Sequence, residues 1–398
     1  MKRYGIIITN YIFAAGMLIS HICGYAAAGI GLFFSLKSLK GFVRERIALL
    51  FVVFLAYGLL RSVFSPEPGT GFMAMLGYFS QWTLPFLLGY SLAELKDVKR
   101  VFWILCGVYL LILLLSVLAY FGLFYQKLAA DTFLVGDEDG LLKGLRSHIA
   151  FAALCLLFSF LFISQSFFSK EASTAKKALF VVLAVIPLGA MFLTGSRGYY
   201  LATAVSYSLF ALFWVISTKR WKLVIGFAAV ALLISAGLYQ LFPNIRYRLQ
   251  NTGMHDRSVI GRVALYKVAV REILANPVFG VGPGQGTRQK QYFLELTEYE
   301  KMLSRHGHLH SIYLNTAAEF GLTGFALAAL IFIEILRRLR SFGFSGAGFE
   351  NALAIGLFWG IIGILIGDVF DTLLRGPGTA MELFWLSGLV FGLAGKHK

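Results

Sequence analysis

Long apolar runs dominate the chain, and short polar segments separate them. The runs cover about residues 4–20, 22–36, 47–63, 73–93, 101–125, 148–168, 178–194, 199–217, 222–242, 310–336, 350–368 and 377–394. A transmembrane helix needs roughly 20 predominantly apolar residues, and most of these runs approach or exceed that length. The pattern predicts an all-α, polytopic integral membrane protein with about twelve transmembrane helices. The first two runs are short and tightly joined, and their merger would reduce the number to eleven.

Composition agrees with the pattern and excludes a soluble globular domain. Of the 398 residues, 58% are hydrophobic and 14% are charged, whereas soluble domains are about 45–50% apolar and about 25% charged. A water-facing globule of this size cannot cover so much apolar surface. The three cysteines all lie inside apolar runs without a paired spacing, which argues against a disulfide framework or a zinc ribbon.

The basic residues indicate how the chain is oriented. The formal net charge is +16, and more than half of the lysines and arginines lie at the two ends and in every second short connection. Positive residues concentrate on the cytoplasmic side of membrane proteins, so we expect both termini in the cytoplasm. The long polar segment 243–309 then faces the periplasm. This division gives three regions: 1–242 with nine helices, the large periplasmic loop 243–309, and 310–398 with the last three helices.

The periplasmic loop carries an unusual excess of basic residues for a translocated segment. Contact with anionic lipid headgroups would explain the excess, and so would an anionic ligand such as a phosphate-bearing lipid. Residues 258–275 read as an amphipathic helix with an apolar face that includes Val270 and Leu274. Asp256 or Ser258 is suited to cap its start.

A glycine-rich turn, 280–286, follows that helix. It lacks the spacing and the preceding strand of a dinucleotide fingerprint, and it lacks the Lys-Ser/Thr of a P-loop. We expect it to turn the chain sharply near the membrane.

Several side chains on the periplasmic side are candidates for chemistry. His306, His308 and His310 alternate before the tenth apolar run. Two or three imidazoles in such a run suit metal ligation, and a single histidine there suits a general base or simple interfacial hydrogen bonding. No cysteine or HExxH acid accompanies them, so we predict no metal. Arg197 lies in a glycine-flanked turn, where it is either a snorkelling side chain or a ligand contact. Glu319 falls within an apolar run, and acids at that depth are costly and often functional.

Three motifs together resemble the O-antigen ligase and polymerase superfamily of bacterial membrane glycosyltransferases. The stretch Thr194-Gly-Ser-Arg-Gly198 resembles the family's Ser-Arg-Gly turn. Gly261-Arg262 through Tyr266, followed by Asn276-Pro-Val-Phe-Gly-Val-Gly282, resembles its periplasmic Arg…Trp…Pro-x-x-G-x-G run, with Tyr266 in place of Trp. His310-Ser-Ile-Tyr-Leu314 and Glu319-Phe-Gly321 resemble its His-Asn-x-Tyr-Leu…Glu-x-Gly run, with Ser311 in place of Asn. The order and the common side of the membrane make the combination specific.

The resemblance implies an enzyme of lipopolysaccharide biosynthesis in the bacterial inner (plasma) membrane. An O-antigen ligase moves a glycan from undecaprenyl diphosphate to lipid A–core at the periplasmic face of the cell envelope. His310 would accept the acceptor proton, and Arg197 and Arg262 would stabilise the diphosphate without a metal or other cofactor. Such a reaction would invert the anomeric carbon. The implied substrate-binding residues are Arg146, His148, His308, Tyr266, Tyr313 and Glu319.

The sequence is compatible with other functions. Members of the same superfamily polymerise repeat units or transfer oligosaccharides to protein, and the motifs alone do not separate these reactions from ligation. A non-catalytic polysaccharide-lipid transporter would place polar groups near the bilayer midplane and show inverted repeats, and no convincing repeat is present. The expected partners are the carrier-linked glycan, the lipid A–core acceptor and membrane lipids, with no nucleic acid.

Overall fold

The computed structural model gives an all-helical membrane fold. It describes residues 2–35, 38–92, 94–123, 141–145, 147–219, 221, 236–237, 239–241, 246–247, 250, 253, 255–304 and 308–396. Within these residues eight helices are long and apolar enough to cross a membrane. They are α4 (Arg46–Val63), α7 (Leu95–Tyr120), α9 (His148–Phe168), α10 (Thr174–Leu193), α11 (Arg197–Thr218), α16 (Ile312–Gly343), α17 (Phe349–Gly367) and α18 (Pro377–Lys396). The predicted all-α, polytopic membrane protein is confirmed.

Three more of the predicted runs also form apolar helices. The first two are α1 (Lys2–Ile19) and α2 (His21–Ser35), with the short α3 (Leu39–Phe42) after them. The fourth run begins with α5 (Pro68–Tyr78), passes through a π-helical turn, η1 (Phe79–Thr83), and ends with α6 (Leu84–Ser91). Pro85 has no N–H for an α-helical bond, and its position explains an interruption here. The predicted ninth span, 222–242, lies almost wholly outside the described residues.

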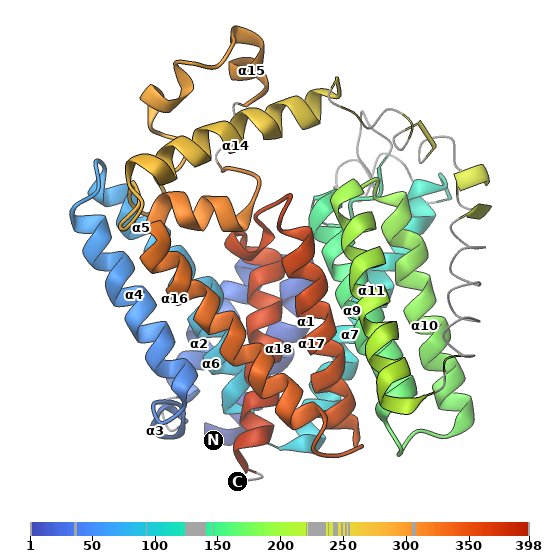
Figure 1. Ribbon diagram of the computed structural model, residues 1–398. Coiled ribbons are helices and arrows are strands. Elements are labelled where there is room, and N and C mark those ends of the chain that lie inside the picture. The colour runs from blue at the N-terminus through green and yellow to red at the C-terminus, as the bar shows by residue number, and fades with distance from the viewer. Residues whose placement is uncertain are drawn as a thin grey trace.

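Both chain ends lie at one end of the bundle, and α14 (Arg257–Ala275) and α15 (Glu298–Leu303) cover the other end (Figure 1).

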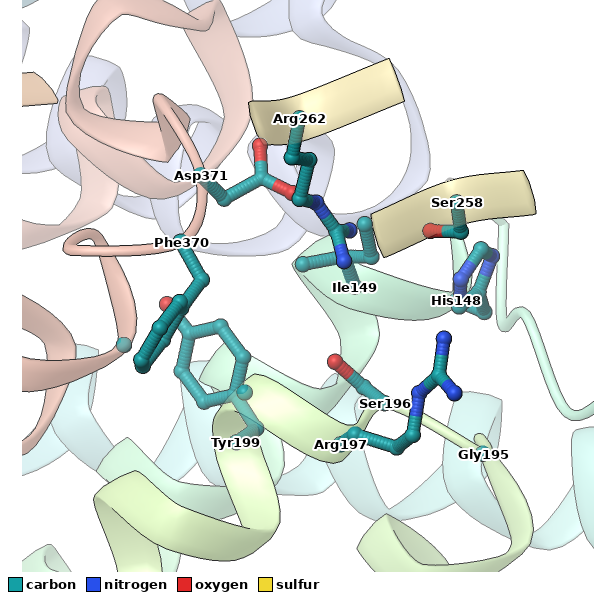
Figure 2. A pocket seen from close by; sticks show the side chains of 12 residues that line it. His148, Ile149, Gly195, Ser196, Arg197, Tyr199, Ser258, Arg262, Phe370 and Asp371 are labelled. Atoms are coloured by element: carbon teal, nitrogen blue, oxygen red, sulfur yellow. The ribbon is translucent and has the colours of Figure 1, made fainter. Parts of the chain in front are cut away.

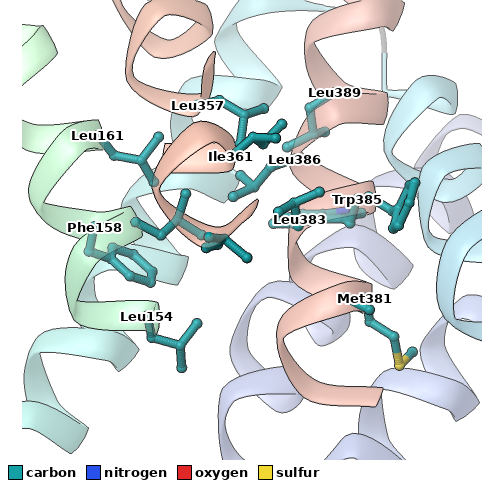
Figure 3. Close-up of a cluster of buried hydrophobic side chains, with 14 of the residues drawn as sticks. Leu154, Phe158, Leu161, Leu357, Ile361, Met381, Leu383, Trp385, Leu386 and Leu389 are labelled. Atoms are coloured by element: carbon teal, nitrogen blue, oxygen red, sulfur yellow. The ribbon is translucent and has the colours of Figure 1, made fainter. Parts of the chain in front are cut away.

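The spanning helices pack closely through small residues. A Cβ atom on Gly388 of α18 would lie 2.1 Å from the Phe86 carbonyl oxygen of α6. The two backbones therefore touch, as small residues permit between membrane helices. Figure 3 shows Phe158, Leu357 and Leu386 filling the core between α9, α17 and α18.

Helix α14 is held to the bundle by a small apolar cluster of its own. Its side chains Ala264, Leu265 and Val268 are fully buried against Leu296 and Ala318. The Asp256 carboxylate accepts hydrogen bonds from the Ser258 and Val259 amides, which confirms the predicted cap.

The apolar face predicted for α14 was partly wrong. Val270 and Leu274 are 46% and 75% exposed, and Glu272 is buried instead. The buried face of α14 instead carries Gly261, Ala264, Leu265, Val268, Ala269 and Glu272, and apolar periodicity does not single out a face that includes an acid.

Helix α16 is broken at Gly321, and the glycine-rich turn repairs the break. Gly321 has φ 67° and ψ −177°, so the carbonyls of Ala318 and Glu319 lose their helical partners. The amides of Val281 and Gly282 donate to these two carbonyls at 2.8 and 2.9 Å, and Leu322 N–H donates to the Pro277 carbonyl at 2.8 Å.

A Cβ atom on Gly280 would lie 2.4 Å from the Glu319 carbonyl oxygen, so this crossing requires glycine. The turn does more than redirect the chain, because it completes the backbone hydrogen bonding of α16.

Candidate active site

Two loops meet at the end of the bundle that α14 covers. One loop, 308–311, leads into α16, and the other, 368–372, follows α17. Ile312 N–H donates to the carbonyl oxygens of Asp368 and Asp371 at 3.0 and 2.9 Å. The Tyr266 hydroxyl of α14 lies 3.0 Å from the His310 carbonyl oxygen and 3.1 Å from that of Val369. Backbone and side-chain contacts therefore fasten the two loops to each other and to α14.

This fastening brings His308, His310 and Asp371 together. One nitrogen of each imidazole and one carboxylate oxygen lie within 4.8 Å of one another. His310 adopts φ 49°, a left-handed conformation that non-glycine residues rarely take. Such strain persists where surrounding contacts over-determine it, and the Tyr266 hydroxyl on its carbonyl is one of those contacts. We call these three residues the histidine–aspartate cluster.

A small polar pocket adjoins the cluster (Figure 2). It is lined by His148 at the start of α9, Arg197 at the start of α11, Arg262 of α14, and Asp371. Its volume of about 60 Å³ is large enough for several water molecules. Asp371 belongs both to this pocket and to the histidine–aspartate cluster, so the cationic and imidazole side chains meet at a single site.

Arg197 forms a two-point ion pair with Asp256. Its Nη1 and Nη2 atoms lie 2.9 and 3.3 Å from the two carboxylate oxygens of Asp256. The hydrogen bond from Arg197 is the main reason that the pKa of Asp256 is lowered from its ordinary value. Asp256 thus links the Arg197 turn to the first turn of α14, and it holds the guanidinium fork in a fixed orientation.

Arg262 offers a donor to the pocket region. Its buried Nε atom has no hydrogen-bond partner among the residues that the structure describes. A buried cationic donor without an acceptor is costly, and an anion bound beside Arg262 would satisfy it.

Glu319 lies in a separate polar network behind the cluster. Its Oε1 atom is 3.0 Å from Arg375 Nη1, and its Oε2 atom accepts a hydrogen bond from the Gly284 amide at 3.0 Å. Arg375 also donates to Asn315 Oδ1 at 3.0 Å. Only 1% of the Glu319 side chain is exposed, so this acid joins α16, the glycine-rich turn and η3 (Leu373–Arg375) from within.

A second buried acid, Glu272, faces this network from α14. Its side chain is fully buried, and neither carboxyl oxygen has a hydrogen-bond partner within the described part of the chain. Burial, with a smaller contribution from the charge of Glu319, raises the pKa of Glu272 to about 9. The carboxyl group is therefore protonated at neutral pH when α14 is docked.

An apolar groove begins next to the cluster. It has a volume of about 190 Å³, and Ile312, Tyr313, Phe325 and Phe332 are among the side chains that line it. The Tyr313 hydroxyl donates to the Leu365 carbonyl at 2.7 Å. Ile312 connects the groove to the site, because its amide holds the Asp371 loop.

The structure brings together most of the residues selected from sequence. His148, Arg197 and Arg262 share the polar pocket. His308 and His310 lie in the adjoining cluster, and Tyr266 joins α14 to it. Tyr313 instead lines the apolar groove, Glu319 lies in the network behind the site, and Arg146 lies outside the described residues.

Sequence reasoning missed two acids at the site. Asp371 lies outside the three motifs, and nothing in the local sequence ties it to His310. Asp256 was selected only as a helix cap. Its position, 59 residues after Arg197, gave no signal of the ion pair.

Comparison with known proteins supports the family resemblance. Residues 182–329 match the family described as O-Antigen ligase. The match includes Arg197, Arg262 and His310 and ends before Asp371. A search of curated proteins finds no match. The match supports the resemblance noted in the sequence, so this multi-pass membrane protein carries a segment similar to the O-antigen ligase and polymerase superfamily.

Proposed function

We propose that this protein is a glycosyltransferase of the O-antigen ligase type. It moves a glycan from undecaprenyl diphosphate to a sugar hydroxyl of lipid A–core. One observation carries the proposal: Asp371 lines the pocket of Arg197 and Arg262, and it also belongs to the cluster with His308 and His310. A candidate base and two permanent cations therefore adjoin one another, as glycan transfer from a diphosphate requires.

His310 acts as the general base in this proposal. The acceptor hydroxyl attacks the anomeric carbon, a new carbon–oxygen bond forms, and the hydroxyl proton passes to the imidazole. Tyr266 holds the His310 backbone. Asp371 lies close enough to favour the imidazolium that forms. Attack from the side opposite the diphosphate inverts the anomeric carbon.

The arginines act on the leaving group. As the bond between the anomeric carbon and the diphosphate oxygen breaks, negative charge grows on the diphosphate. Arg262 contributes its buried Nε–H. The Arg197 fork is pre-formed on the Asp256 carboxylate, and a diphosphate carries more negative charge and would replace that carboxylate on the fork. These fixed positive charges do the work that a divalent cation does in other glycosyl transfers, so the reaction needs no metal.

The remaining selected residues have supporting roles. His148 and His308 contact phosphate or sugar, as does Arg146. The apolar groove that Ile312 and Tyr313 line holds part of the polyprenyl tail. Glu319 supports the site through Arg375 and the glycine-rich turn. Both chain ends face the cytoplasm, and the site faces the periplasm, in agreement with the distribution of lysine and arginine.

A purified-enzyme assay tests the chemistry. Full-length protein in detergent micelles is mixed with undecaprenyl-diphosphate-linked glycan and lipid A–core, and the product is measured by gel shift. His310→Ala should abolish transfer, and the matched control His255→Ala, which removes an exposed histidine, should retain it. Transfer that survives in His310→Ala excludes His310 as the base.

A deletion strain separates ligation from polymerisation. Loss of a ligase leaves lipid A–core without polymer while polymer accumulates on the lipid carrier. Loss of a polymerase leaves lipid A–core capped by single repeat units, and this result would reject the ligase assignment within the same superfamily.

A further inference from the structure

The histidine–aspartate cluster has the ligand set of a transition-metal site. Two imidazoles and one carboxylate with a further open position recur in mononuclear zinc sites. Zinc binds such ligands at about 2.0–2.2 Å, so tetrahedral ligand atoms lie about 3.4 Å apart. The three ligand atoms here already lie within 4.8 Å of one another. Small side-chain rotations therefore suffice to bring them to coordinating distance.

The backbone around the cluster is already ordered for this geometry. Ile312 N–H bonds the carbonyl of Asp371, and the Tyr266 hydroxyl bonds the carbonyl of His310. Thr372 N–H donates to Asp371 Oδ1 at 2.8 Å and fixes the carboxylate. Hydrogen bonds of this kind orient metal ligands and raise affinity. A bound ion would not have to assemble the two loops.

The ligands also restrict which ion can bind. Imidazole nitrogens suit zinc, whereas magnesium and calcium prefer several oxygen ligands. Asp371 is the single acid of the cluster, and the positive charge of Arg262 in the same pocket opposes a cation. We therefore expect affinity to come from the two nitrogen donors and to be weak for magnesium.

We propose that Zn²⁺ binds His308, His310 and Asp371 and that this binding inhibits glycan transfer. The inhibitory part rests on the proposed function of His310 as the general base. The nitrogen lone pair that coordinates zinc cannot also accept the proton of the acceptor hydroxyl. The same site would then have two exclusive states, one open for catalysis and one closed by the ion.

Direct zinc binding tests the site without any reliance on activity. Full-length protein in detergent micelles competes with a chromophoric zinc chelator, and the stoichiometry and dissociation constant are fitted. We expect one zinc ion per chain, with a loss of affinity of at least about 100-fold in His308→Ala and Asp371→Asn. His255→Ala, which removes an exposed histidine elsewhere, should bind like the unaltered protein.

Folding controls keep this test decisive. Asp371→Asn retains an oxygen to accept the Thr372 amide, so its thermal unfolding should match that of the unaltered protein. No binding to the unaltered protein overturns the proposal. Equal binding by all four proteins also overturns it, because the ion would then lie elsewhere.

The transfer assay then tests inhibition. Saturating zinc should abolish product formation, excess EDTA should restore it, and magnesium should have no effect at the same concentration. Zinc that binds the cluster without slowing transfer would overturn the inhibitory part. A protein that binds zinc at this site but transfers no glycan under any condition would refute the proposed function and leave the metal site intact.

Discussion

Glu272 provides a quantitative test of how α14 is docked. The side chain is fully buried where α14 meets α16, and its pKa is raised from the ordinary 4.5 to about 9 by burial and by Glu319. When α14 lifts off, the carboxyl group returns to water and to its ordinary pKa. The docked form therefore binds a proton that the undocked form releases between those two values.

The sign and size of the effect follow from this difference. Stability that depends on protonated Glu272 is fully present below pH 4.5 and is lost as the pH rises toward 9. Each pH unit in this window changes the free energy of undocking by about 1.4 kcal/mol. Between pH 4.5 and pH 7.5 the free energy of undocking therefore falls by about 4 kcal/mol. A glutamine does not titrate, so Glu272→Gln should stabilise the docked form at pH 7.5 by up to about this amount. The amide of the introduced glutamine loses its hydration when α14 docks, and this cost reduces the gain in stability.

Hydrogen exchange of α14 peptides measures the undocking directly. Protein in detergent micelles is labelled from pH 5 to pH 9, and opening free energies are corrected for the intrinsic pH dependence of exchange. In the unaltered protein, protection of α14 should fall as pH rises, and in Glu272→Gln it should stay level. Glu298→Gln, which alters an acid with 91% side-chain exposure on α15, should behave like the unaltered protein. Identical pH profiles for Glu272→Gln and the unaltered protein would refute a buried, protonated Glu272.

Four other predictions address the site. Arg197→Lys should lower transfer at least about 100-fold, because lysine keeps the charge but not the two-point fork. A near-normal kcat would reject the role of the Arg197 fork in binding the diphosphate. Tyr266→Phe should lower kcat about tenfold with KM unchanged, because it loses the hydroxyl contact with the His310 carbonyl; an effect on KM alone would reject a positioning role. Gly280→Ala should lower the Tm in detergent markedly, because Gly280 has φ +68° and a Cβ there would lie 2.4 Å from the Glu319 carbonyl oxygen. An unchanged Tm would contradict the close contact between the glycine-rich turn and α16. Transfer should persist in excess EDTA, and a sharp loss would point to a required metal.

The membrane fold was largely predictable because it depends on local properties. Run length and hydropathy identify spanning helices, and Asp256 marks the start of α14 by a short-range capping rule. The break at Gly321 was not predictable in the same way. An apolar run continues through it, and the partner that satisfies the exposed carbonyls lies about 40 residues earlier in the chain. Local pattern does not reveal a helix interruption that a distant turn repairs.

Site residues in local motifs were likewise predictable, and site residues positioned by long-range contacts were not. Arg197, Arg262 and His310 stood out because each lies in a short motif. Asp371 did not, since contacts between distant segments bring its loop beside His310, namely the hydrogen bonds of the Ile312 amide and of the Tyr266 hydroxyl. Glu272 was hidden for a different reason, because an acid on an amphipathic helix is ordinarily assigned to the water-facing side.

The break in α16 also makes the position of the 308–311 loop independent of bilayer thickness. An unbroken helix of 32 residues would be about 48 Å long, well beyond a hydrocarbon core of about 30 Å. Residues 322–343 alone span about 33 Å and match the core closely. The segment 312–320 is bound to the glycine-rich turn and to the Asp371 loop, so it stays with the water-facing layer. In thicker or thinner membranes residues 322–343 can tilt about Gly321 to relieve hydrophobic mismatch. His310 then keeps its position beside the pocket.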